Sequence, residues 1–112
     1  MAESTSGKPY ITALDFEESR ENIYYYTLNE FGPFQAERYA ERIQKAIDTL
    51  PHWYMLYPEC RHMRTKSRMY RNIILEAHLI IYRITEHCVE VLDIVYSASS
   101  IGKIRNTRRI RV

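Results

Sequence analysis

The sequence lacks the features that mark several special classes of protein. It holds only two cysteines, Cys60 and Cys88, whose spacing fits neither a zinc knuckle nor a redox motif. No apolar run approaches the length of a membrane-spanning helix, and the first residues, MAESTSGKP, contain no apolar stretch of a secretory signal. These absences argue against a disulfide-rich secreted scaffold and an integral membrane protein. We therefore expect a cytoplasmic protein with reduced thiols and no membrane partner.

Repeats, low-complexity segments and linkers are absent from the sequence as well, so nothing in it marks a second domain. A length of 112 residues allows one modest hydrophobic core. A hydrophobic fraction of 46% with 27% charged residues is typical of an ordinary globular protein. We expect a flexible N-terminus over residues 1–8, one domain over residues 9–104 and a basic C-terminal tail over residues 105–112.

Charge is distributed unevenly along the chain, although the net charge is only +2. Residues 1–60 contain 5 Lys and Arg against 10 Asp and Glu, whereas residues 61–112 contain 11 against 4. Such asymmetry predicts a basic face for an anionic partner, either nucleic acid or an acidic protein segment. The alternative is that the two halves neutralise each other across the fold. The sequence leaves both interpretations open.

The first half of the chain predicts one short strand and two helices. PYITAL (residues 9–14) is β-leaning and fits an edge strand, and Asp15 after it has the position of an N-cap in a capping box. The helix that follows ends at Gly32-Pro33, where a second amphipathic helix begins and continues until Pro51 stops it. So short a link between the helices predicts an antiparallel hairpin.

Three strands are predicted after an irregular, basic segment. They are MYRNIIL (69–75), HLIIYRIT (78–85) and CVEVLDIVY (88–96), with two residues between each pair. Linkers this short force antiparallel hairpins. The order β-α-α-β-β-β predicts an α+β domain with a helical hairpin on one face of a small sheet, and we expect Ile43 and Ile81 in its core.

A zinc site and a nucleophile are two chemistries that the residue types allow. The metal-ligand types in question are Cys60, His62, His87 and Cys88. Adjacent strand residues point to opposite faces and the pairs lack knuckle spacing, so we expect no metal and no cofactor. At the rim where the last strand ends lie Tyr96, Ser97, Ser99 and Ser100. No Gly-x-Ser-x-Gly elbow surrounds these serines, so a cap on a helix beginning near Ile101 is favoured over catalysis.

The basic residues divide into two groups that we expect to bind the target or a nucleic acid. One group leads into the second strand and the other lies toward the C-terminus; the candidates are Arg61, Arg64, Lys66, Arg68, Lys103 and Arg105. If both groups flank one surface of the sheet, they form a positive groove suited to phosphate. Aromatic residues are not regularly interleaved with them, which weakens the case for nucleic acid.

The combined order and spacing of these elements resembles the RelE/ParE superfamily of toxins from bacterial type II toxin–antitoxin systems. The resemblance runs from about Tyr10 to Ile104 and is most specific in YRNIILEAHLIIYRITEHCVEVLDIVY, with further similarity in AERYAERIQKAIDTLP followed by YMLYPE. It implies a helical hairpin packed on a small curved antiparallel sheet, and a cognate antitoxin that wraps the toxin. RelE-like members cut messenger RNA on the ribosome, whereas ParE-like members inhibit DNA gyrase.

Few of the residues that RelE-like nucleases use are present at the matching positions of this chain. Arg71 stands where RelE-like nucleases have a basic residue, but Ile73 and Leu79 stand where they have two others. Ser97-Ala98-Ser99-Ser100 replaces an arginine that many members carry after the last strand. Each missing cation would have stabilised the transition state, so the resemblance favours the ParE-like members.

The first hypothesis is therefore a growth-inhibiting toxin of the plasmid-stabilisation type. It would bind a cellular target such as DNA gyrase and be neutralised by its antitoxin. One alternative is a ribosome-dependent mRNA endonuclease with a rearranged site of Arg71, His78 and Arg83. Another is an inactive relic, or a binding module that acts only together with its antitoxin. A homodimer is left open.

Overall fold

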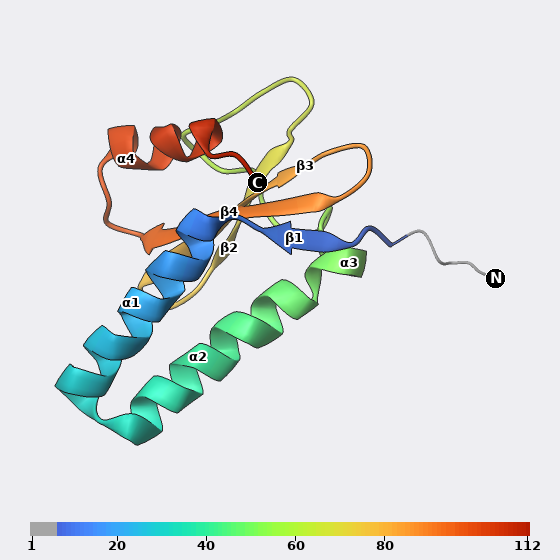
Figure 1. The fold of residues 1–112 in the computed structure, drawn as a ribbon. Coiled ribbons are helices and arrows are strands. Elements are labelled where there is room, and N and C mark those ends of the chain that lie inside the picture. The colour runs from blue at the N-terminus through green and yellow to red at the C-terminus, as the bar shows by residue number, and fades with distance from the viewer. Residues whose placement is uncertain (1–6) are drawn as a thin grey trace.

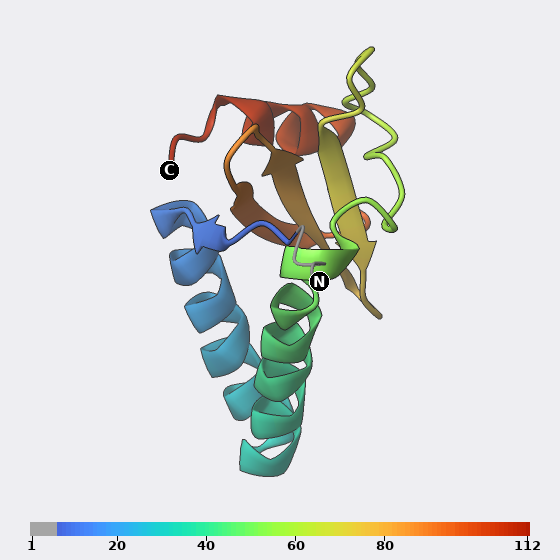
Figure 2. The ribbon, with the colours of Figure 1, turned by 90° about the vertical axis from the view of Figure 1, so that its right-hand side faces the viewer.

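A helical hairpin and a four-stranded sheet form the main layers of the fold in the computed structural model, which describes residues 7–112 (Figure 1). The expected α+β architecture is confirmed. The hairpin lies on one side of the sheet and a short C-terminal helix on the other (Figure 2). Of the N-terminus expected to be flexible, residues 1–6 lie outside the described part, whereas the Lys8 amide donates to the Pro51 carbonyl at 2.9 Å. Within residues 7–112 no helix is long and apolar enough to cross a membrane.

The hairpin consists of α1 (Leu14–Phe31) and α2 (Pro33–Asp48), and a single turn of helix, α3 (Leu50–Trp53), follows it. The predicted capping box at Asp15 is wrong, because α1 begins at Leu14 and Asp15 therefore lies inside its first turn. The N-cap is Ala13, which makes no side-chain capping bond. α2 is amphipathic as predicted and buries Ala36, Ile43 and Ile47. α2 was expected to end at Pro51, but it already ends at Asp48, and Pro51 lies in the first turn of α3.

Gly32 links the two helices in a conformation that glycine alone adopts readily. Its φ is +88° and its ψ 171°, and open space surrounds the position of an added Cβ. We expect Gly32→Ala to lower the free energy of unfolding by about 1–3 kcal/mol through backbone strain, measured by urea denaturation. Gly102→Ala is the matched control, because Gly102 is helical with similar open space and alanine there should stabilise by about 0.5–1 kcal/mol. Equal shifts of the two midpoints would contradict this account of Gly32.

The sheet has the strand order β1-β4-β3-β2. Its strands are β1 (Tyr10–Thr12), β2 (Tyr70–Ile74), β3 (His78–Ile84) and β4 (Val89–Tyr96). The three later strands pair antiparallel through their short turns, as predicted. β1 is an edge strand as predicted, but it pairs parallel to β4, with Tyr10 opposite Val89. No tight turn joins β1 to β4, so the constraint that makes the other pairs antiparallel does not act on it.

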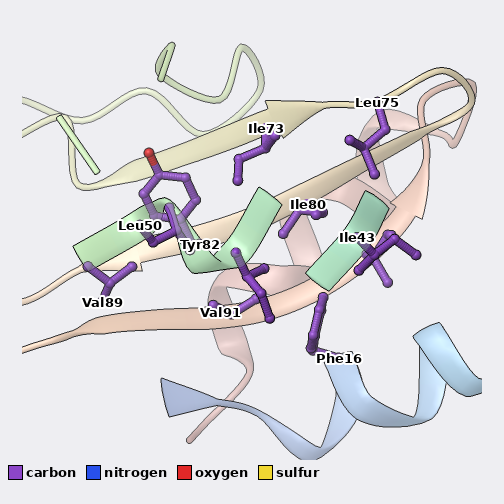
Figure 3. Close-up of a cluster of buried hydrophobic side chains, with 11 residues drawn as sticks. Phe16, Ile43, Leu50, Ile73, Leu75, Ile80, Tyr82, Val89 and Val91 are labelled. Carbon is purple, nitrogen blue, oxygen red and sulfur yellow. The ribbon is translucent and has the colours of Figure 1, made fainter. Parts of the chain in front are cut away.

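Two apolar clusters cover the two faces of the sheet. The cluster facing the hairpin includes Phe16, Ile43, Ile73, Ile80, Tyr82, Val89 and Val91 (Figure 3). The cluster on the other face consists of Cys60, Met63, Ile81, Leu92, Val95 and Ile104. The register between β3 and β4 shifts at Ile81/Tyr82, which leaves Leu92 as an extra residue in β4. This bulge lets Val91 and Ile94 contribute to the same cluster despite their odd spacing.

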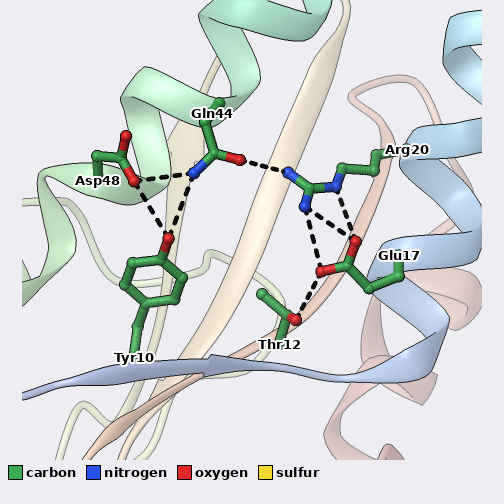
Figure 4. Close-up of polar contacts among 6 residues, drawn as sticks. All are labelled: Tyr10, Thr12, Glu17, Arg20, Gln44 and Asp48. Atoms are coloured by element: carbon green, nitrogen blue, oxygen red, sulfur yellow. Dashed lines mark hydrogen bonds and ion pairs between the residues drawn. The ribbon is translucent and has the colours of Figure 1, made fainter.

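A chain of polar contacts fastens β1 to both helices of the hairpin (Figure 4). Thr12 Oγ1 donates to the Glu17 carboxylate at 2.6 Å, and Arg20 binds that carboxylate and the Gln44 side-chain oxygen, each at 2.9 Å. At the other end Tyr10 and Gln44 both donate to Asp48. A strand of only three residues therefore gains side-chain partners that its backbone ladder cannot supply.

The chain after β4 forms α4 (Ile101–Asn106) and a short 3₁₀ helix, η1 (Thr107–Arg109). The predicted serine cap is confirmed, because Ser100 Oγ accepts a hydrogen bond from the Lys103 amide at 3.1 Å. α4 runs across residue 104, where the domain was expected to give way to a basic tail. Ile104 is buried and Ile110 packs against the cluster on the outer face of the sheet, so part of the 105–112 segment is packed on the sheet.

Candidate functional site

The two predicted groups of basic residues meet at one groove on the outer side of the sheet. The loop before β2 supplies Arg61 and Arg64, and the C-terminal helices supply Arg105 and Arg108. His62, Met63, Thr65 and Tyr70 complete the lining of a hollow of about 440 Å³. All four arginines are exposed, and no carboxylate lines this hollow within the described residues. We call it the basic groove; its charge fits an anionic partner.

A second hollow of about 490 Å³ continues from the basic groove and shares Arg61, His62 and Arg64 with it. Its remaining lining is largely apolar and includes Ile74, Leu79 and Ile104. Ile74 is 65% exposed at the edge of the sheet, so apolar surface is open to a partner here. We call this the apolar hollow. A basic groove beside exposed apolar surface is a combination that protein interfaces use, with charge at the rim and apolar contact at the centre.

The remaining predicted target-binding residues lie outside the basic groove. Lys66 and Arg68 are exposed in the same loop but do not line either hollow. Lys103 lines a different pocket, described below. Arg105 has a structural contact as well, because its Nε donates to the His62 carbonyl at 3.2 Å and so holds α4 to the loop.

Arg71, the first of the three candidate catalytic residues, is built into the fold. Its side chain is only 9% exposed. Nη1 donates to the carbonyls of Met55 and Tyr57 at 2.9 and 3.0 Å, and Nε donates to the Arg68 carbonyl at 3.1 Å. The guanidinium therefore holds together two segments of the long loop before β2. The Tyr82 hydroxyl, from the neighbouring strand, adds a bond to the Tyr54 carbonyl at 2.7 Å.

Arg83, the second candidate, is engaged on the opposite face of the sheet from Arg71. It forms a 2.6 Å ion pair with Glu90 on the adjacent strand, and both side chains are largely buried. It also donates to the carbonyls of Arg108 and Ile110, which fixes the C-terminal helices against the sheet. Arg71 and Arg83 thus cannot act on one reacting group without leaving these partners.

His78, the third candidate, lies at the far end of β3, facing the hairpin. It is 6% exposed, and its Nδ1 is 2.7 Å from the Tyr39 hydroxyl of α2. The Tyr96 ring packs against it, with the ring centres 4.6 Å apart. His78 and Tyr96 line a pocket of about 300 Å³ together with Ser19, Asn22, Ile23, Tyr26, Ile94, Val95 and Lys103. We call it the rim pocket; it shares no lining residue with the basic groove or the apolar hollow.

The buried imidazole of His78 predicts a pH dependence of stability. Burial lowers its pKa from the ordinary value of 6.5, so the folded protein takes up a proton less readily than the unfolded chain. The stability that neutral His78 contributes is fully present above pH 6.5 and falls as the pH drops toward the lowered pKa. Urea denaturation at neutral pH and in mild acid should show a larger loss of stability for the wild type than for His78→Gln. Parallel losses in both proteins would contradict this assignment.

The serines at the strand end have backbone and capping roles in the structure. The Ser97 amide donates to the Ala77 carbonyl and the Ser99 amide to the Tyr96 carbonyl, each at 2.9 Å. Ser97 also lines the apolar hollow.

Neither cysteine is paired, and burial raises the pKa of the Cys60 thiol. Among residues 7–112 no three His, Cys, Asp or Glu side chains lie close enough together to hold a metal ion.

Arg108 belongs to the basic group toward the C-terminus and lines the basic groove, although it was not among the named target-binding candidates. The sequence analysis missed Tyr39 beside His78. No signal in the sequence marks Tyr39, because its place on the apolar stripe of α2 says nothing about which strand end its hydroxyl will meet.

Comparisons with known proteins identify the family and the fold. The model of the family described as "ParE toxin of type II toxin-antitoxin system, parDE" matches residues 10–101. Among solved structures, the chain is similar to one described as "Chromosomal ParDE TA system from P. aeruginosa", with a TM-score of 0.68 and 15% sequence identity. The alignment covers 82% of this chain and 98% of the solved one, which shows a shared fold. A comparison with curated protein sequences gives no match.

Proposed function

Because the chain belongs to the ParE toxin family of type II toxin–antitoxin systems, we propose that it arrests growth by binding DNA gyrase and that a cognate antitoxin neutralises it. The observation that carries this proposal is the basic groove with the apolar hollow beside it. Together they form an open surface with exposed arginines and apolar side chains. Such a surface can hold a large acidic partner by charge and apolar contact without any chemical step.

The placement of the candidate catalytic residues favours binding over RNA cleavage. Arg71 is engaged by loop carbonyls and Arg83 by Glu90. A general base and a phosphate-binding cation must lie within hydrogen-bond reach of one substrate. These two arginines lie on opposite faces of the sheet, and His78 is buried at the other end of β3.

The test is inhibition of DNA supercoiling by purified gyrase. We expect the wild-type protein to inhibit supercoiling at stoichiometric concentrations, and Arg61→Glu/Arg64→Glu to inhibit at least about tenfold more weakly, because rim charges steer association. Arg38→Glu/Lys45→Glu is the matched control, since it reverses two exposed charges on α2 away from the basic groove. The control should inhibit like the wild type.

Two outcomes would overturn the proposal. Unchanged supercoiling at saturating wild-type protein would remove gyrase as the target. Cleavage of messenger RNA within ribosomes, at codon-specific positions in cells that express the wild type, would instead make the protein a nuclease. Growth arrest without such cleavage, relieved by co-expression of an antitoxin, is the result that the proposal expects.

A further inference from the structure

The rim pocket contains a buried polar atom that has no partner within the described residues. His78 is 6% exposed, and its Nε2 makes no hydrogen bond. Leaving a buried donor or acceptor without a partner costs about 1–3 kcal/mol, so native structures rarely do so without a reason. His78 lines the rim pocket and its Nδ1 is engaged with the Tyr39 hydroxyl, so Nε2 is the ring nitrogen left for a ligand.

The surroundings of His78 decide whether Nε2 carries a proton. Burial raises the pKa of the Tyr39 phenol, so the phenol keeps its proton and can donate it. Its hydroxyl lies 2.7 Å from His78 Nδ1, and we assign Tyr39 as the donor of this hydrogen bond. A neutral imidazole that accepts at Nδ1 carries its proton at Nε2. The atom without a partner is therefore an N–H donor that lacks an acceptor.

The rest of the rim pocket supplies positive charge and donors. Lys103 is exposed at its edge and Asn22 contributes a side-chain amide. No carboxylate is among the lining residues that the structure describes. Asp93 lies close enough to Lys103 for their charges to interact, but its carboxylate already accepts from Ser19 Oγ at 2.6 Å and from the Ile94 amide at 2.8 Å. Tyr26 and Tyr96, both about half exposed, form aromatic sides.

We propose that the rim pocket receives the carboxylate of an aspartate or glutamate side chain of the antitoxin. The carboxylate accepts from His78 Nε2–H and pairs with Lys103, while the two tyrosines pack against its aliphatic stem. The Tyr96 ring, stacked on His78, shifts to admit it. A charge-assisted hydrogen bond is stronger than a neutral one, which suits a partner that must stay bound. This inference rests on the proposed neutralisation by an antitoxin and not on the identity of the target.

The antitoxin is favoured over the target because the rim pocket is separate from the basic groove. The two hollows share no residue, so a target bound in the groove leaves the rim pocket free. A carboxylate in the rim pocket adds an anchor to the other contacts of an antitoxin that wraps the toxin, and linked contacts bind more tightly than each alone.

The first measurement is the tautomer and ligand response of His78 by ¹⁵N NMR of the histidine ring. We expect a protonated Nε2 in the free protein, and a saturable shift of the His78 resonances on titration with N-acetyl-glutamate α-amide. N-acetyl-glutamine α-amide, the neutral analogue of similar shape, should give no saturable shift. Lys103→Gln should abolish the response, whereas Lys45→Gln, an exposed lysine on α2, should keep it. Both variants alter exposed side chains, so folding is preserved.

Three results would overturn the proposal. The first is a proton at Nδ1 instead of Nε2; the second is an equal response to the glutamine analogue. The third is loss of gyrase inhibition in Lys103→Gln, which would assign the carboxylate to the target. If neither the wild type nor Lys103→Gln inhibits gyrase, but the wild type still responds to the carboxylate, the assignment of gyrase as the target fails. The proposal for the rim pocket then stands.

Discussion

Replacing Arg71 with methionine should destabilise the protein by about 3 kcal/mol, because hydrogen bonds from a charged donor contribute roughly 1.5–3 kcal/mol each and are not fully additive. The variant loses three bonds to loop carbonyls. Methionine keeps much of the aliphatic stem, so the loss reports mainly on the guanidinium. The segment around Met55 and Tyr57 loses its attachment to β2 and should become accessible to proteases before the rest of the molecule unfolds.

Urea denaturation measures the effect, and limited proteolysis locates it. Arg61→Met is the matched control, since Arg61 is exposed in the same loop and its replacement should change stability by less than about 0.5 kcal/mol. Arg71→Lys should recover only part of the loss, because an ammonium group cannot reproduce the planar fork that reaches all three carbonyls. If Arg71→Met unfolds at the wild-type urea concentration, the structural role assigned to Arg71 is wrong.

Truncating the core on either face of the sheet is the second change with a large expected effect. Ile43 is 2% exposed in the cluster facing the hairpin, and Ile81 is fully buried in the cluster on the other face. Ile43→Ala and Ile81→Ala should each lower the free energy of unfolding by about 2–5 kcal/mol, through lost burial and the cavity left behind.

The two truncations also test whether the clusters are energetically separate. Their side chains lie on opposite faces of the sheet, so the effects should add to within about 0.5 kcal/mol in a double variant that is still folded. Denaturation curves of the single variants, with Leu56→Ala as an exposed control (74% exposed), supply the measurement. Single variants as stable as Leu56→Ala would show that these isoleucines are not core residues.

Much of the fold was predictable because short-range signals set it. Two-residue linkers dictate antiparallel strands, Gly32-Pro33 dictates a helix break, and Ser100 has the residue type and place of an N-cap. The partner of β1 was not predictable, since no turn connects it to β4. The bulge that leaves Leu92 unpaired in the β4 ladder was also missed. Where a strand is apolar on both faces, its pattern of apolar and polar residues does not show the position at which side chains switch from one face to the other.

The candidate site was predictable in outline but not in the roles of individual arginines. Arg61, Arg64 and Arg105, which the uneven charge distribution singled out, line one hollow. Arg71 and Arg83 have the same residue type and lie on strands, yet each is used to hold a distant segment in place. Apart from Glu90, which pairs with Arg83, their acceptors are backbone carbonyls of irregular loops and helix ends. Every residue has a carbonyl, so the sequence does not mark which one an arginine will meet.

The pairing of β1 with β4 also determines when the protein can finish folding during its synthesis. Tyr10 leaves the ribosome early, but its ladder partner Val89 emerges only after the helical hairpin and two further strands. Until then the sheet that covers the apolar stripe of α2 is incomplete, and pairing of such sequence-distant strands is slow. The sheet therefore cannot be completed until most of the chain has been synthesised. The basic groove, which needs α4 as well as the loop before β2, forms last, so a partial chain cannot yet bind a target there.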